Sequence, residues 1–85
     1  MQKTKLSEII ETYINGNITV AINEASSWRV DKIQIIYCSE LFGLRTTLKI
    51  LKTIGISDLI IFNSFHDHDR DRFSEVKEIL LNNFY

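Results

Sequence analysis

The segment of residues 32–64, KIQIIYCSELFGLRTTLKILKTIGISDLIIFNS, constrains the fold of this chain more than any other part of the sequence. It contains two apolar runs, residues 33–38 and 59–62, that are rich in β-branched and aromatic side chains. Runs of this kind are typical of strands that are buried on both faces of a parallel sheet. Between them lies a segment with helical periodicity that ends at Gly55. We therefore predict a β-α-β crossover, a connection that is right-handed in about 98% of cases.

A helix and a further strand are predicted before this segment. The apolar face of the helix consists of Leu6, Ile9, Ile10, Tyr13 and Ile14. Thr4 or Ser7 can serve as its N-cap, and Asn15 and Gly16 are typical of a helix end. Residues 18–22 then alternate between apolar and polar side chains, which predicts a half-buried strand.

Two more helices are predicted, one inside the crossover and one after it. The helix of the crossover should begin near Ser39 and Glu40. Its buried stripe consists of Leu41, Leu44, Leu48, Leu51 and Ile54. A last helix follows Asp69 or Asp71, either of which can cap it. Its apolar residues are Phe73, Val76, Ile79, Leu80 and Phe84.

These elements occur in the order α-β-β-α-β-α within a single domain of residues 1–85. The predicted fold class is α/β, or α+β, with a single-layer sheet of about three strands that helices cover on at least one face. The competing prediction is an all-α chain in which residues 44–54 and 58–65 form a helix-turn-helix with Gly55 in the turn. The second of these helices contains no Lys or Arg to contact DNA, so we favour the sheet.

The composition is that of an ordinary globular protein without a strong electrostatic preference. Of its 85 residues, 45% are hydrophobic and 25% are charged, and the formal net charge is −1. A near-neutral chain lacks the basic surface that attracts nucleic acids and anionic membranes. No stretch is long and apolar enough to span a membrane. The single Cys38 has no second cysteine to pair with, which indicates a reducing compartment, the cytoplasm.

Cys38 is the first candidate for a chemical site, because the predicted strand ends there and a helix begins. Backbone N–H groups at such a position bind anions and lower the pKa of a thiol. Ser39 and Arg45 follow closely and could contact a phosphate, but the spacing from Cys38 to Arg45 is one residue longer than in phosphatase loops. An anion- or phosphate-binding domain, with phosphoryl transfer at this loop, is therefore an alternative prediction. We favour a buried, structural cysteine.

The second candidate site is the sequence HDHDRD at residues 66–71. His66 and His68, with carboxylates between them, are residue types that bind transition metals. The chain contains no third histidine, and alternating Asp and Arg ahead of a helix are typical of a solvated capping loop. We therefore predict neither a metal site nor a cofactor.

A binding function is favoured because no catalytic constellation is complete. Trp28 and Arg29 lie in a polar connecting segment and belong to the residue types that are enriched at interface hot spots. Tyr13 and the first helix could extend the same surface. Since a short chain buries a modest core, a second copy could cover the remainder in a symmetric homodimer. We expect a small cytoplasmic regulatory or adaptor domain that binds another protein or itself, rather than an enzyme or a nucleic-acid-binding protein.

Overall fold

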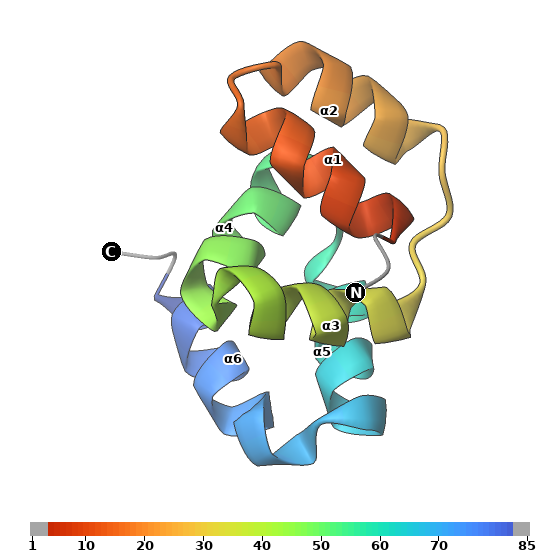
Figure 1. Cartoon of the computed structure of the whole chain (residues 1–85). Helices are drawn as coiled ribbons and strands as arrows, with labels where there is room; N and C mark the ends of the chain where they lie inside the picture. Colours follow the sequence, from red (N-terminus) through yellow and green to blue (C-terminus); the bar gives the residue numbers. More distant parts are fainter. Residues whose placement is uncertain (1–3, 83–85) are drawn as a thin grey trace.

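The structure, a computed structural model, describes residues 4–82, and these residues form six α-helices and one short 3-10 helix without any strand (Figure 1). The helices are α1 (Lys5–Ile14), α2 (Ile18–Ser26), α3 (Lys32–Phe42), α4 (Leu44–Thr53), α5 (Asp58–His68) and α6 (Phe73–Leu81), and the 3-10 helix η1 (Arg70–Arg72) precedes α6. The predicted α/β or α+β fold with a sheet of three strands is therefore wrong. The fold is all-helical, which is the fold class of the competing prediction.

α3 lies at the centre of the molecule and packs against α1, α4 and α5 (Figure 1). It contains residues 33–38, which we predicted as a strand. The helix begins where the Asp31 side chain accepts a hydrogen bond from the backbone N–H of Ile33 at 3.0 Å. The sequence of α3 is apolar on several sides, and other helices pack against more than one of them. It therefore lacks the one-sided periodicity by which a surface helix is recognised in a sequence.

α5 contains residues 59–62, the other strand of the predicted crossover. Ser57 caps this helix by accepting a hydrogen bond from the backbone N–H of Ile60 at 3.3 Å. The buried residues of α5 are Ile61, Ser64 and Phe65. Their spacing of three and four positions is that of one helical face. Since α3 and α5 are both helices, the β-α-β crossover predicted between them does not exist.

α2 replaces the strand that we predicted over residues 18–22. Its buried residues are Ala21 and Ala25, one helical turn apart, and they pack towards α1. The alternating residues Ile18, Val20 and Ile22 are all exposed. Two small alanines thus form the buried side of α2. The larger β-branched residues are on the outside, and their alternation along the sequence suggested a strand in place of a helix. α1 and α2 form a helical hairpin at one end of the molecule (Figure 1).

Gly43 alone separates α3 from α4, and its φ of 91° is a conformation that other residues rarely adopt. The helix that we predicted from Ser39 onwards is therefore divided between α3 and α4. Leu48 and Leu51 of the predicted stripe are buried, as expected, whereas Leu41 is exposed. Leu41, the residue of this stripe that precedes the glycine, lies on a different helix axis, so it does not share one face with the rest.

The first predicted helix is confirmed. Thr4 caps α1 by accepting a hydrogen bond from the backbone N–H of Ser7 at 3.1 Å, and the Ser7 hydroxyl in turn accepts one from the N–H of Thr4 at 2.9 Å. The helix ends before Asn15 and Gly16, as predicted. Leu6, Ile9 and Ile10 are fully buried.

The last predicted helix is confirmed over Phe73–Leu81, where Val76, Ile79 and Leu80 are buried. Phe84 lies outside the described residues. The predicted cap is wrong, because Asp69 precedes η1 rather than α6. The N-cap position of α6 is Arg72, and its side chain makes no capping hydrogen bond.

All six helices contribute apolar side chains to one core. The hairpin of α1 and α2 lies at one end of the molecule, α3 and α4 in the middle, and α6 at the other end (Figure 1). The accessible surface is 5290 Å², and roughly 5200 Å² is expected for a folded monomer of this mass. One chain therefore encloses its core as well as a typical monomer does. The argument that a second copy is needed to complete a modest core therefore does not hold for this chain.

Ile33 and Ile35 test the helical assignment of α3 directly. Two residues that are two positions apart face the same side of a strand but roughly opposite sides of a helix. Ile35 is fully buried, whereas Ile33 is 60% exposed. We expect Ile35→Ala to lower the free energy of unfolding by about 2–4 kcal/mol and the matched Ile33→Ala by less than about 0.5 kcal/mol, measured by urea denaturation. Equal losses in the two variants would contradict the helix.

Candidate interaction surface

α2 lies on the outside of the molecule and packs almost entirely against α1 (Figure 1). The chain has no charged residue between Glu11 and Glu24. This uncharged run covers the end of α1, the connection and most of α2. Since charged residues make up 25% of the chain, the run differs clearly from the rest of the surface.

Four large apolar side chains are exposed along the uncharged run. Ile14, Ile18, Val20 and Ile22 have exposed fractions of 53%, 45%, 50% and 38%, and together we call them the hairpin face. Ile14 and Ile18 flank the connection between α1 and α2, and Ile22 follows Ile18 one helical turn along α2, whereas Val20 lies on another side of the same helix. Exposed apolar side chains that cluster on a protein surface mark interaction sites, whereas scattered ones need no explanation, and these four all belong to the hairpin of α1 and α2.

Polar contacts hold the hairpin at the end that is remote from the connection between α1 and α2. Lys5 Nζ lies 3.3 Å from Glu24 Oε2, so the start of α1 is joined to the end of α2. The side-chain Oε1 of Gln34, on α3, accepts a hydrogen bond from the backbone N–H of Leu6 at 3.0 Å. Ile14 lies about 14 Å further along α1. Ile14 and Ile18 therefore lie at the opposite end of the hairpin from these contacts, whereas Ile22 lies two positions from Glu24.

The residues that we predicted as partner contacts are not among the four of the hairpin face, although Tyr13 lies in the uncharged run next to Ile14. Tyr13 and Trp28 are half-buried and pack against the core, and Arg29 is exposed. Trp28 lies in the connection from α2 to α3, where its ring helps to cover the core. A role of these three residues in binding stays a prediction. Sequence reasoning missed the hairpin face because residues 18–22 were assigned to a strand. The uncharged run was the signal that could have found it.

Cys38 is fully buried in the middle of α3 and does not follow a strand. Burial raises the pKa of its thiol to about 11, and a hydrogen bond with the Thr4 side chain offsets part of this rise. Ser39 is buried as well. Its hydroxyl donates to the carbonyl of Ile36 at 2.7 Å and accepts from Arg72 at 2.8 Å. Neither side chain is open to an anion, and the strand-end loop on which the phosphate alternative depended does not exist.

Arg45, the third residue of that alternative, lies on α4 and not beside Cys38 or Ser39 in one loop. It lines a shallow pocket of about 180 Å³ together with Glu75 and Glu78 of α6. Two carboxylates in the same pocket work against the binding of an anion there. The three predicted anion contacts are therefore not brought together.

Arg72 joins η1 to α3. Its Nε donates to Asp69 Oδ2 at 2.5 Å, and its Nη2 donates to the Ser39 hydroxyl. The guanidinium carbon lies 5.6 Å from the centroid of the Phe65 ring. The Arg72 side chain is only 27% exposed. An arginine that is largely covered and engaged in this way stabilises the structure rather than awaiting a ligand.

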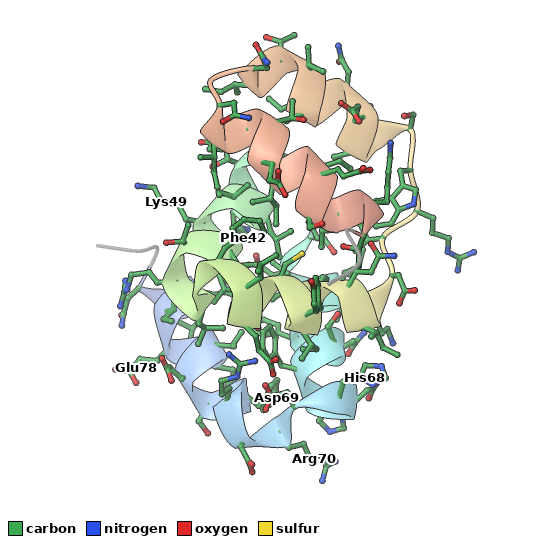
Figure 2. The ribbon with its side chains drawn as sticks, in the orientation of Figure 1. Phe42, Lys49, His68, Asp69, Arg70 and Glu78 are labelled. Atoms are coloured by element: carbon green, nitrogen blue, oxygen red, sulfur yellow. The ribbon has the colours of Figure 1, made fainter. Side chains whose placement is uncertain are left out.

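His66 is engaged on both ring nitrogens. Arg70 approaches Nε2 at 2.9 Å, and because a guanidinium only donates, the proton of the neutral ring is on Nδ1, 3.1 Å from Asp67 Oδ1. Hydrogen bonds from His66 and from Lys32 lower the pKa of the Asp67 carboxyl. His68 is exposed (Figure 2), and because it is two positions further along α5 it lies on a different side of the helix. No group of three metal-binding side chains occurs among residues 4–82.

α4, the turn at Gly55 and α5 correspond to the helices of the alternative helix-turn-helix. The side chains that α5 exposes are Leu59, Ile60, Asn63, His66, Asp67 and His68. None of them is Lys or Arg, so α5 lacks the phosphate contacts that position a recognition helix on DNA. Lys49 of α4 points away from the molecule (Figure 2), and Lys52 forms an ion pair with Asp58.

No protein-family model, curated protein or solved structure significantly matches this chain. Within residues 4–82, none of the helices has the length and apolar character to cross a membrane. The longest are α3 and α5, with 11 residues each, against about 20 for a membrane span. Function must therefore be inferred from the surface of the molecule itself.

The raised pKa of Cys38 predicts how stability depends on pH. Below the pKa of the unfolded thiol, about 8.5, the thiol is protonated in both the folded and the unfolded chain, and its contribution to the stability of the fold is complete. As the pH rises towards the folded pKa of about 11, the unfolded chain loses its proton first, so stability falls. Relative to Cys38→Ala, we expect the wild type to lose up to about 3 kcal/mol between these limits, measured by urea denaturation at each pH. A constant difference between the two proteins would show that the thiol is not shielded.

Arg72 and Arg70 form a matched pair for testing the contact between η1 and α3. Arg72→Met removes the donors to Asp69 and Ser39, and we expect a loss of about 1–3 kcal/mol in the free energy of unfolding. Arg70 is exposed, and its two hydrogen bonds, to the ring and the carbonyl of His66, are open to water, so Arg70→Met should change stability by less than about 0.5 kcal/mol. Thermal unfolding measures both. Similar losses in the two variants would mean that the contacts of Arg72 contribute little.

Proposed function

We propose that this chain is a small cytoplasmic protein-binding domain, regulatory or adaptor in role, that contacts its partner through the hairpin face and performs no chemistry. One observation carries the proposal, which is that exposed apolar side chains coincide with the uncharged run on the outermost helix. The centre of a protein interface is depleted of charged residues, because each charge would have to lose its water on binding.

The energy available from the hairpin face suits a reversible contact. Fully burying a Val or Ile side chain contributes roughly 1.5–3 kcal/mol. Since about half of each of these four side chains is still exposed, each offers on the order of 1 kcal/mol. A micromolar complex requires about 8 kcal/mol in total. Polar groups must supply the remainder, and Thr19 and Asn23 are exposed, uncharged hydrogen-bonding residues on the same helix.

A non-catalytic role is supported by the state of the reactive side chains. The Cys38 thiol is buried, the Ser39 hydroxyl is engaged with Arg72, and the ring of His66 is held by its two neighbours. Each of these groups has a structural use. The cytoplasm is proposed because a single buried cysteine has no need of an oxidising compartment.

A photo-crosslinking amino acid at Val20 tests the proposal in the source cell. We expect the Val20 derivative to form adducts with a defined protein, and the same residue at Leu59, which is an exposed apolar position on α5, to form none. Introducing Asn23→Lys, at a position that is exposed one helical turn along α2 from the crosslinker, should abolish the adducts, because it puts a charge into the contact. If Val20 and Leu59 gave the same adducts, or neither gave any, the proposal would be refuted.

A further inference from the structure

We infer that Asn15, in the connection between α1 and α2, is a site of spontaneous deamidation, and that the carboxylate formed there ends the binding of a partner to the hairpin face. The modification needs no enzyme, and water is its only co-reactant. Its effect on binding rests on the proposed function. Asparagine is among the thermolabile residues of proteins. Asn15 precedes Gly16, and no other asparagine of this chain precedes a glycine.

The reaction converts the side-chain amide of Asn15 into a carboxylate in two steps. In the first, the backbone nitrogen of Gly16 attacks the side-chain carbonyl carbon Cγ of Asn15. A C–N bond forms to give a five-membered cyclic imide, and the amide nitrogen leaves as ammonia, taking the proton of the Gly16 N–H. In the second, water opens the imide at one of its two carbonyls, which gives aspartate or isoaspartate. In sum, the asparagine and one water become a carboxylate and an ammonium ion.

Gly16 leaves its own backbone nitrogen open to this attack. It has no Cβ, its φ is 95°, and a Cβ built at this position would meet nothing within 4 Å. A glycine backbone also has more accessible conformations than that of any other residue, so it can follow the rotation that the imide requires. Asn17 is an internal comparison, because it is exposed in the same connection but precedes the β-branched Ile18, which crowds the attacking nitrogen.

The local backbone restrains the attack only weakly. Asn15 is the C-cap of α1 with a ψ of 2°, and rotation about its Cα–C bond must bring the Gly16 nitrogen towards Cγ. This rotation breaks two hydrogen bonds, from the N–H of Gly16 to the carbonyl of Tyr13 at 3.0 Å and from the N–H of Asn17 to the carbonyl of Thr12 at 3.1 Å. Both lie at an exposed helix end, where fraying costs little free energy.

The asparagines inside helices are protected by comparison. Asn23 lies within α2 and Asn63 within α5, and both are exposed. The backbone N–H that follows each of them is in a helix, so the attack requires that helix to open first. Exposure of the side chain alone therefore does not distinguish Asn15. The following glycine and the position at a helix end do.

The product places a negative charge in the uncharged run. Asn15 is adjacent to Ile14 and three positions before Ile18, two of the four residues of the hairpin face. A partner that covers these isoleucines would have to remove water from the new carboxylate, which an amide does not require to the same degree. Since Asn15 is exposed, the charge has little effect on the core. Deamidation thus changes the surface and leaves the fold in place.

Incubation of the purified protein at neutral pH in water labelled with heavy oxygen, followed by peptide mapping with mass spectrometry, tests the modification. We expect label to enter at Asn15 at least about tenfold faster than at Asn17, Asn23 or Asn63. Asn15→Gln should suppress labelling at this position, because its longer side chain would have to form a six-membered ring. Equal rates at Asn15 and at the other three asparagines would overturn the inference and leave the proposed function untouched.

Asn15→Asp carries the product charge and tests the effect on binding in the crosslinking experiment at Val20. We expect the yield of adducts to fall at least about tenfold. Asn15→Gln, which is neutral, and Asn63→Asp, which puts the same charge on α5, are the matched controls and should keep the wild-type yield. Circular dichroism confirms that each variant is folded.

The outcomes separate the inference from the proposed function. Adducts at Val20 that survive Asn15→Asp overturn the inference, whereas the proposed function stands. If Val20 captures nothing even in the wild type, the proposed function falls and the effect on binding falls with it, while the mass spectra still decide whether Asn15 is the site of modification.

Discussion

The rest of the fold depends on covering α3, a helix that is apolar on more than one side. α1, α4 and α5 pack around it, and α2 and α6 are added outside these contacts. The polar groups within this packing are paired. Thr47 donates to the carbonyl of Cys38 at 2.9 Å, and Gln34 accepts from the start of α1. Among the described residues, no buried side-chain nitrogen or oxygen lacks a hydrogen-bond partner. A small domain can thus enclose a central helix without leaving polar atoms unsatisfied, which would cost more than the core gains.

The sequence predicted the helices that have one buried face and failed for those that do not. α1 and α6 show apolar residues at helical spacing because they cover the core from one side, and both were predicted correctly. α3 is apolar on exposed as well as buried sides, so its apolar run resembles a strand, and α2 is buried through alanines, so its larger residues suggested an alternation. Capping residues were informative for α1, α3 and α5. Asp31 and Ser57 begin α3 and α5, and giving their capping potential more weight than the β-branched composition would have corrected both assignments.

The candidate site was predictable only in part. That Cys38 is buried agrees with the structural interpretation that we favoured, although its position on a helix was not foreseen. The hairpin face was missed, because an interaction surface is defined by exposure, and exposure depends on which elements pack against each other. The absence of charge from Glu11 to Glu24 was visible in the sequence. Its meaning became clear only once α2 was placed on the outside of the molecule.

The peripheral position of α2 has a consequence for the local stability of the chain. A helix whose contacts are almost all with one neighbour can detach without opening the core, so its amide hydrogens exchange through local openings at a lower free energy than global unfolding. Whatever covers the outer side of α2 would close these openings. Slower amide exchange confined to α2 is therefore the expected signature of an occupied hairpin face, and the amides of α3 would hardly respond.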